Sequence, residues 1–196
     1  MNRYFIIYKP YLVLSQFTSQ NEQKNLLHFF AVPKDVYAVG RLDYDSEGLL
    51  ILTNDTTLNH RLLHPHFEHE REYWVQVDGA ITGEAMQQLQ NGVAITIDGK
   101  MYKTKRCKAK HLGDDIVVPQ RNPPIRFRSH IPAPWISLIL QEGKNRQVRK
   151  MTAQVGFPTL RLIRQRIENV ELGNLQPGEM IELSQKTMYA KLNLNH

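Results

Sequence analysis

The sequence is poor in cysteine: Cys107 is the single cysteine among 196 residues. One cysteine cannot form an intramolecular disulfide or supply the thiolates of a cysteine-based zinc site, which favours a reducing compartment. Long hydrophobic runs are also missing. The apolar stretch at residues 4–8 is too short for a signal peptide or a membrane span. We therefore expect a cytoplasmic protein without a membrane partner.

Common cofactor and catalytic motifs are absent too. The chain has no P-loop, no dinucleotide glycine fingerprint and no Gly-x-Ser-x-Gly sequence. The acidic residues from Asp43 to Glu47 resemble the start of a calcium loop. However, the twelfth position holds Asn54 instead of a bidentate glutamate, and Gly48 falls at the wrong place. We predict no calcium site.

Four histidines lie close together in the sequence, at positions 60, 64, 66 and 69. His60 and His64 are one helical turn apart, but Pro65 interrupts the helix and no further ligand follows at a recognised zinc spacing. We predict no metal site here and interpret these histidines as polar surface or as RNA-facing residues.

Charge is distributed unevenly along the chain. Residues 100–166 hold 16 Lys and Arg against 3 acidic residues, whereas the rest holds 9 basic against 16 acidic residues. The basic part also contains Tyr102, Phe127, Trp135 and Phe157, which makes a purely solvated charge run less attractive. A small protein that is basic in one part indicates a polyanionic partner, and nucleic acid is the leading candidate.

The hydrophobic pattern predicts an α+β fold. Strands are expected at residues 5–8, 49–52, 72–77, 93–97, 135–140, 159–167 and 180–183, and helices at residues 26–30, 56–63, 82–90 and 146–155. The Asp98-Gly99 pair predicts a hairpin into residues 100–110. Because these elements alternate irregularly, we expect a mixed or mostly antiparallel central sheet flanked by helices and loops rather than a βαβ repeat.

Two segments stand out as candidates for function. In residues 40–55 an acidic turn runs straight into the apolar run 49–52, which places Asp43 at the edge of a core. A carboxylate there needs a nearby cation, and Arg41 is the nearest in sequence. In residues 142–151 a glycine turn opens a helix with Arg146, Arg149 and Lys150 at helical spacing. Cations at a helix start oppose its dipole, so we expect an anionic partner.

These two segments together resemble the RsuA/RluB/RluE/RluF family of pseudouridine synthases. The resemblance begins at Lys9-Pro10, includes Arg71-Glu72-Tyr73, and continues to Pro177-Gly178, so it covers nearly the whole chain. The branch with the greatest similarity is RluE, which modifies 23S ribosomal RNA, and the similarity is carried by residues 121–126, Ile131-Pro132, Trp135, residues 151–153 and residues 155–164. Many relatives carry an S4 RNA-binding domain ahead of the catalytic domain, and because the Lys-Pro element begins at residue 9 here, we expect no such domain.

The resemblance implies a single pseudouridine synthase catalytic domain over residues 1–196, or two lobes that share one sheet with the active-site cleft between them. It implies that Asp43 is the catalytic aspartate, acting as nucleophile or as base at the ribose. Tyr73 matches the tyrosine that stacks on the flipped uracil, and Arg149 matches the cation that keeps the aspartate ionised. Supporting or RNA-binding positions are implied for Arg41, Arg71, Arg126, Arg146, Lys150, Leu162 and Arg164.

The implied reaction detaches uracil from the ribose, rotates it and rejoins it through C5. A uridine in folded RNA must leave its stack first, which requires an aromatic platform, an apolar wall and cations for the backbone. No redox agent takes part, so we expect no cofactor and no metal. The expected partner is 23S ribosomal RNA, free or in an assembling large subunit, bound by a monomer. The alternative is a non-catalytic ribosomal-RNA-binding or ribosome-assembly protein on the same fold.

Overall fold

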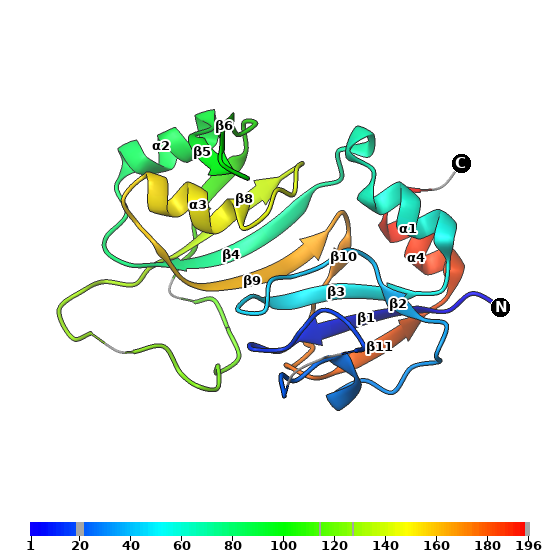
Figure 1. Cartoon of the computed structure of the whole chain (residues 1–196). Helices are drawn as coiled ribbons and strands as arrows, with labels where there is room; N and C mark the ends of the chain where they lie inside the picture. The colour runs from blue at the N-terminus through cyan, green and yellow to red at the C-terminus, as the bar shows by residue number, and fades with distance from the viewer. Residues whose placement is uncertain (19–21, 114, 127, 195–196) are drawn as a thin grey trace. The chain divides into compact units, whose positions relative to one another are not determined.

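The computed structural model describes residues 1–18, 22–113, 115–126 and 128–194 (Figure 1). Phe127, one of the aromatic residues within the basic part, lies outside these residues. The chain forms two compact units. Unit 1 comprises Met1–His69 and Ile163–His196, and unit 2 comprises Glu70–Leu162. The expectation of one catalytic domain stays a prediction.

A mixed sheet forms the centre of unit 1. Strand β1 (Tyr4–Lys9) lies between β11 (Met180–Leu183) and β3 (Glu47–Thr53) and is antiparallel to both. Strand β3 pairs in parallel with β9 (Thr159–Ile167), and the paired residues Ile163 and Arg164 belong to this unit. The short strands β2 (Tyr37–Ala38) and β10 (Val170–Glu171) pair with β3 and β9.

The core of unit 1 is built on β1 and β3, in which every residue is buried. Strands covered on both faces are typically continuous apolar runs, as residues 49–52 are. Side chains from one face of both strands pack together with the loop that follows β1. This cluster contains Phe5, Ile7, Val13, Leu26, Phe30, Val36, Leu50 and Leu52.

Two helices of unit 1 meet at a buried carboxylate. Asp55 caps α1 (Thr56–Leu63) by accepting hydrogen bonds from the backbone amides of Thr57 and Leu58. Its other oxygen accepts from the hydroxyls of Tyr4 and of Tyr189 in α4 (Gln185–Lys191), both at 2.7 Å. Asp55 thereby ties β1, α1 and α4 together. The unit also contains the short 3-10 helices η1 (Leu26–His28) and η2 (Pro65–Phe67).

Unit 2 is an antiparallel sheet with two helices and a hairpin. Strand β8 (Trp135–Leu140) lies between β4 (Arg71–Val77) and β7 (Lys108–His111). Strands β5 (Ala94–Ile97) and β6 (Lys100–Lys103) form the hairpin, and its turn at Asp98-Gly99 has positive φ at both residues. The helices are α2 (Gly83–Asn91) and α3 (Gln147–Gln154).

The expected α+β class with a mixed sheet is confirmed, and most predicted elements lie within a residue or two of the observed ones. Residues 100–110 differ, because they form two strands, β6 and β7, instead of one. Between them Thr104 donates its backbone amide to the carbonyl of Val93, and Cys107 donates to that of Gln90. The first bond continues the pairing of β5 with β6, and the second ties the chain to the end of α2. Helix α4 was not predicted.

Within the described residues, no helix is long and apolar enough to cross a membrane.

Candidate active site

Asp43 occupies the first position of a tight turn at the head of β3. The backbone amide of Ser46 donates to the carbonyl oxygen of Asp43 at 3.0 Å, which closes the turn. Asp43 is half-buried, whereas Ser46 and Glu47 are buried. Asp43 therefore lies at the border between the core of unit 1 and its surface, as the sequence predicts.

A serine fixes the backbone directly before Asp43. The hydroxyl of Ser15 donates to the carbonyl oxygen of Leu42 at 2.8 Å and accepts from the amide of the same residue at 3.0 Å. Both residues are buried, so the two bonds are shielded from water. Ser15 therefore satisfies both backbone polar groups of Leu42 and sets the direction in which the chain enters the turn.

Lys9 is a buried cation that interacts with the acidic turn. Its amine donates to the carbonyl oxygens of Pro10 at 2.9 Å and Val13 at 2.7 Å, and its side chain is fully buried. Burial lowers the pKa of Lys9 to about 7, although the carboxylates of Glu47, Asp45 and Asp43 counteract this effect. Arg41, the nearest cation in sequence, is exposed. The sequence signal for Lys9 was its position as the one charged residue at the end of an apolar strand.

Arg164 supports the same region from β9. It is buried, and its Nε donates to the carbonyl oxygen of Leu49 in β3 at 2.8 Å. The parallel pairing of β3 with β9 brings Gly48 so close that a Cβ atom there would lie 2.4 Å from the carbonyl oxygen of Arg164. Gly48 also has a φ of +104°, which favours glycine. This geometry fits a supporting position for Arg164 better than a phosphate-binding one.

In unit 2, Tyr73 and Leu162 belong to one apolar cluster. Tyr73 lies on β4 opposite Leu138 of β8, is half-buried, and packs against a core that includes buried Leu162. Val148 and Met151, from the inner face of α3, belong to the same core. The structure thus brings together the predicted uracil-stacking tyrosine, the predicted apolar wall and the helix that carries the predicted cations.

Helix α3 begins with a left-handed residue. Arg146 is its N-cap residue, with φ +52° and ψ 31°, and its side chain is exposed and makes no capping hydrogen bond. Arg149 and Lys150 follow in the first turn and are half-buried. The helix therefore starts at Gln147, one residue later than predicted. The exposed guanidinium of Arg146 lies at the helix start, where an anion would be favoured.

Glu142 organises the turn that leads into α3, and sequence reasoning did not single it out. Its carboxylate accepts from the hydroxyl of Tyr102, from the side-chain amide of Gln147 and, at 2.9 Å, from the backbone amide of Lys105. The hydrogen bond to Glu142, together with burial, raises the pKa of Tyr102 to about 12. The ammonium of Lys144 lies 5.1 Å from the centre of the Tyr102 ring. Glu142 therefore joins the turn to the β6 strand.

The remaining predicted RNA-binding residues of unit 2 are accessible. Arg126 is exposed in the loop between β7 and β8, and Arg71 is half-buried on β4. In the same loop Arg128 forms an ion pair with Asp78 at 3.1 Å. Among the residues that the structure describes, no group of three or more His, Cys, Asp or Glu side chains could hold a metal ion.

Comparison with known families decides the identity of the fold. The model of the RNA pseudouridylate synthase family matches residues 3–154. The chain belongs to this family. Pseudouridylate synthases are isomerases, so the expected enzyme class is confirmed together with the predicted family.

Curated relatives and a solved structure agree with this placement. The chain is 47% identical to ribosomal large subunit pseudouridine synthase E of Vibrio parahaemolyticus over 93% of its own length and 74% of the relative. It is also 47% identical to the protein of that name from Xanthomonas axonopodis pv. citri over 88% of its length and 89% of the relative. A crystal structure of a pseudouridylate synthase matches with a TM-score of 0.78 and 26% identity, covering 98% of this chain and 74% of that one.

The predicted site residues of this pseudouridylate synthase divide between the two units. Unit 1 contains Asp43, Arg41 and Arg164, together with the newly identified Lys9 and Ser15. Unit 2 contains the remaining predicted residues, namely Arg71, Tyr73, Arg126, Arg146, Arg149, Lys150 and Leu162. The catalytic roles of Asp43, Tyr73 and Arg149 stay predictions.

Proposed function

We propose that this pseudouridylate synthase isomerises a uridine of 23S ribosomal RNA and that Asp43 is its catalytic group. The substrate class is supported by the likeness to enzymes named ribosomal large subunit pseudouridine synthase E, which extends over about nine-tenths of this chain. The observation that supports Asp43 is its place in a closed turn whose backbone is fixed by Ser15 and whose acids face the buried Lys9.

In the proposed reaction no atoms are gained or lost overall. The Asp43 carboxylate acts on the ribose, as nucleophile at C1′ or as base, and the bond between N1 and C1′ breaks. The uracil turns and C5 bonds to C1′, which either displaces Asp43 from C1′ or is accompanied by return of the proton that Asp43 took from the ribose. The proton of C5 then leaves to solvent while N1 gains one. Tyr73 stacks on the base, Leu162 packs beside it, and Arg149 keeps the carboxylate ionised. The exposed Arg41, Arg126 and Arg146 and the half-buried Arg71 and Lys150 bind the RNA backbone.

The substrate proposal is tested by incubating the protein with unmodified 23S and 16S ribosomal RNA transcripts and mapping pseudouridine in both. We expect conversion at a defined uridine in the 23S transcript and none in the 16S transcript. The same result is expected in the presence of a metal chelator, because no step uses a metal. Conversion of the 16S transcript alone, or of neither, would contradict the proposed substrate.

The proposal extends to the state and place of the protein. We expect a monomer in the cytoplasm of a bacterium, where ribosomal RNA is modified. Light scattering coupled to size-exclusion chromatography measures the mass directly, and a mass near 22.8 kDa is expected. A mass twice as large would contradict the monomer.

A further inference from the structure

Four exposed ring side chains gather at the end of α1 and on η2. They are His60, His64, His66 and Phe67, and we call them the ring surface. His64 is central, with ring centres 5.3 Å from His60, 6.4 Å from His66 and 5.9 Å from Phe67. Exposed rings packed against one another form a continuous π-rich face. Leu63, also exposed, follows on the same helix.

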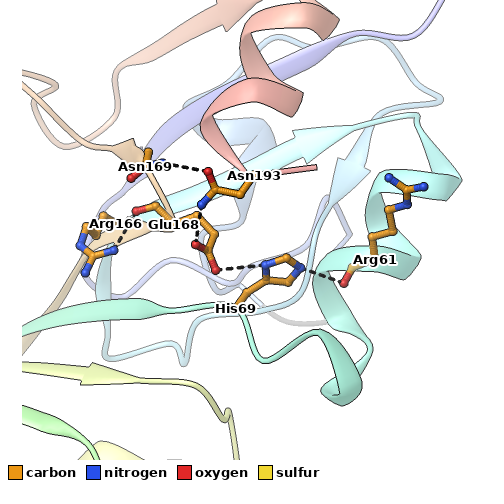
Figure 2. A network of polar contacts seen from close by, with 6 residues as sticks. All are labelled: Arg61, His69, Arg166, Glu168, Asn169 and Asn193. Atoms are coloured by element: carbon orange, nitrogen blue, oxygen red, sulfur yellow. Dashed lines mark hydrogen bonds and ion pairs between the residues drawn. The ribbon is translucent and has the colours of Figure 1, made fainter. Parts of the chain in front are cut away.

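Next to the ring surface lies a polar network around the buried His69, which Figure 2 shows. The imidazole of His69 lies between the carboxylate of Glu168, at 3.1 Å from Nδ1, and the carbonyl oxygen of Arg61, at 3.2 Å from Nε2. Asn193 donates to the second carboxylate oxygen of Glu168 at 3.0 Å. His69 is 7% exposed, so water competes little for the two bonds of its imidazole. The network therefore joins the segment after η2 to the turn between β9 and β10 and to the residues after α4.

Phe67 is connected to this network by its ring. It stacks on His69 with an interplanar angle of 22° and a centre separation of 6.1 Å, yet remains 44% exposed. One face of the Phe67 ring is held by His69 and the rest of the ring is exposed. A side chain that is already held in place loses little conformational entropy when a ligand covers it. The ring surface is thus prepared for stacking rather than freely mobile.

The charge of the segment suits an anionic ligand. Residues 56–67 contain no acidic residue, and Arg61 is the one side chain among them that carries a formal positive charge at pH 7. The apolar side of α1, with Leu58 and Leu62, is buried in unit 1, so the rings are not required for the core. Unpaired RNA bases stack on Phe and His rings, and such stacking tolerates any base.

From these observations we propose that the ring surface binds unpaired bases of the RNA substrate by stacking, in addition to the nucleotide that is modified. This inference rests on the proposed function, because it takes RNA as the substrate class. It assigns to His64 and Phe67 a role in substrate affinity, and none in the chemistry at the ribose.

The test measures fluorescence anisotropy with a labelled unpaired RNA of about ten nucleotides. The second probe has the same phosphates but abasic sites in place of the bases. We expect Phe67→Ala and His64→Ala each to weaken binding of the first probe about tenfold. Phe67→Trp and His64→Phe keep a ring and are expected to bind like the wild type. The wild type should bind the abasic probe about as weakly as the alanine variants bind the intact one.

Phe29→Ala is the matched control, because Phe29 is 38% exposed and directly follows the other 3-10 helix of unit 1. It should bind like the wild type. Equal binding by Phe67→Ala and Phe29→Ala, or equal binding of both probes by the wild type, would overturn the proposal. A protein-binding role for the ring surface predicts that same unchanged RNA binding. If Phe67→Ala unfolds in a thermal scan, the RNA binding of His64→Ala tests the proposal instead.

The failure of this inference can be told apart from the failure of the proposed function. A wild type that converts uridine while the variants bind RNA normally refutes this inference alone, whereas a wild type that does not bind RNA refutes the proposed function.

Discussion

The hydroxyl of Ser15 forms two hydrogen bonds with the backbone of Leu42, at 2.8 Å to its carbonyl oxygen and at 3.0 Å from its amide. Leu42 directly precedes Asp43, so a side chain far away in the sequence controls how the acidic turn leaves the core. Buried backbone groups that lose their partners are costly. The turn therefore depends on Ser15 both for its stability and for the direction of Asp43.

Ser15→Ala removes both hydrogen bonds and leaves two buried polar groups unpaired. We expect a loss of about 2 kcal/mol in the free energy of unfolding, measured by urea titration. We also expect a clear fall in kcat with little change in the Kd for RNA, because Asp43 is misdirected while the basic surface is intact. Ser184→Ala is the control, since it removes the N-cap of α4 at a cost of about 1 kcal/mol. A similar fall in kcat in the control would contradict the positioning role.

Gly48→Ala should be strongly destabilising. The new Cβ would lie 2.4 Å and 2.7 Å from backbone atoms of Arg164, and φ is +104°. We expect a loss of about 4 kcal/mol or more, or failure to fold. Gly173→Ala provides the comparison, because Gly173 has a φ of +56° but open space around it, and should cost only about 1 kcal/mol. Equal thermal shifts in the two variants would show that the strand approach is looser than the structure indicates.

Lys9 predicts a pH dependence of stability. Its folded pKa of about 7 lies below the usual value of about 10.4 in an unfolded chain. Between these values the unfolded state binds more protons, so stability should rise with pH, with a slope of up to about 1.4 kcal/mol per pH unit. Lys9→Met should remove this slope between pH 7 and 10, and Lys34→Met, which changes an exposed lysine, should preserve it. An unchanged slope in Lys9→Met would contradict the assignment.

The lowered pKa of Asp55 predicts that the stability of the protein depends on pH in the acidic range. Burial by itself raises its pKa, but the hydrogen bonds from Tyr189, Tyr4 and the helix amides together lower it below the usual value. A carboxyl with a lowered folded pKa stabilises the protein above its unfolded pKa, and this contribution is lost as pH falls through the folded pKa. Asp55→Asn retains the cap but loses charge-assisted bonds, so it should cost about 2 kcal/mol at pH 7. The difference from the wild type should shrink toward pH 2, and a constant difference would argue against a charged Asp55.

Much of the fold could be predicted from local patterns. The apolar run at 49–52 and the Asp98-Gly99 turn are strong local signals, and both are found as a buried strand and as a hairpin. Helix α4 was missed because it is short and its helical residues include a single buried one, Met188. Its position depends on the bond from Tyr189 to Asp55, which no window of sequence near residue 189 contains.

The candidate site residues that belong to recognisable motifs could be predicted from the sequence. Asp43 and Arg149 follow from the two long motifs and Tyr73 from the Arg71-Glu72-Tyr73 element, and the roles of all three stay predictions. Ser15 and Glu142 could not be assigned roles from the sequence, because each acts through partners distant in the chain. Lys9 bonds the nearby carbonyls of Pro10 and Val13, but the acids that act on its pKa lie in a distant turn. Ser15 meets Leu42, and Glu142 meets Tyr102. Such contacts are properties of the tertiary fold, whereas a cation adjacent in sequence, such as Arg41, can simply point to solvent.

The most direct test of the central claim measures tritium release from 23S ribosomal RNA labelled at uridine C5, because C5 loses its hydrogen when it bonds to C1′. The wild type and Asp45→Asn, which changes a neighbouring acid of the same turn, should both release label. Asp43→Asn should bind the RNA with unchanged affinity and release none. Equal release by the wild type and Asp43→Asn would contradict the catalytic role of Asp43, and binding without release by the wild type would favour a non-catalytic RNA-binding protein.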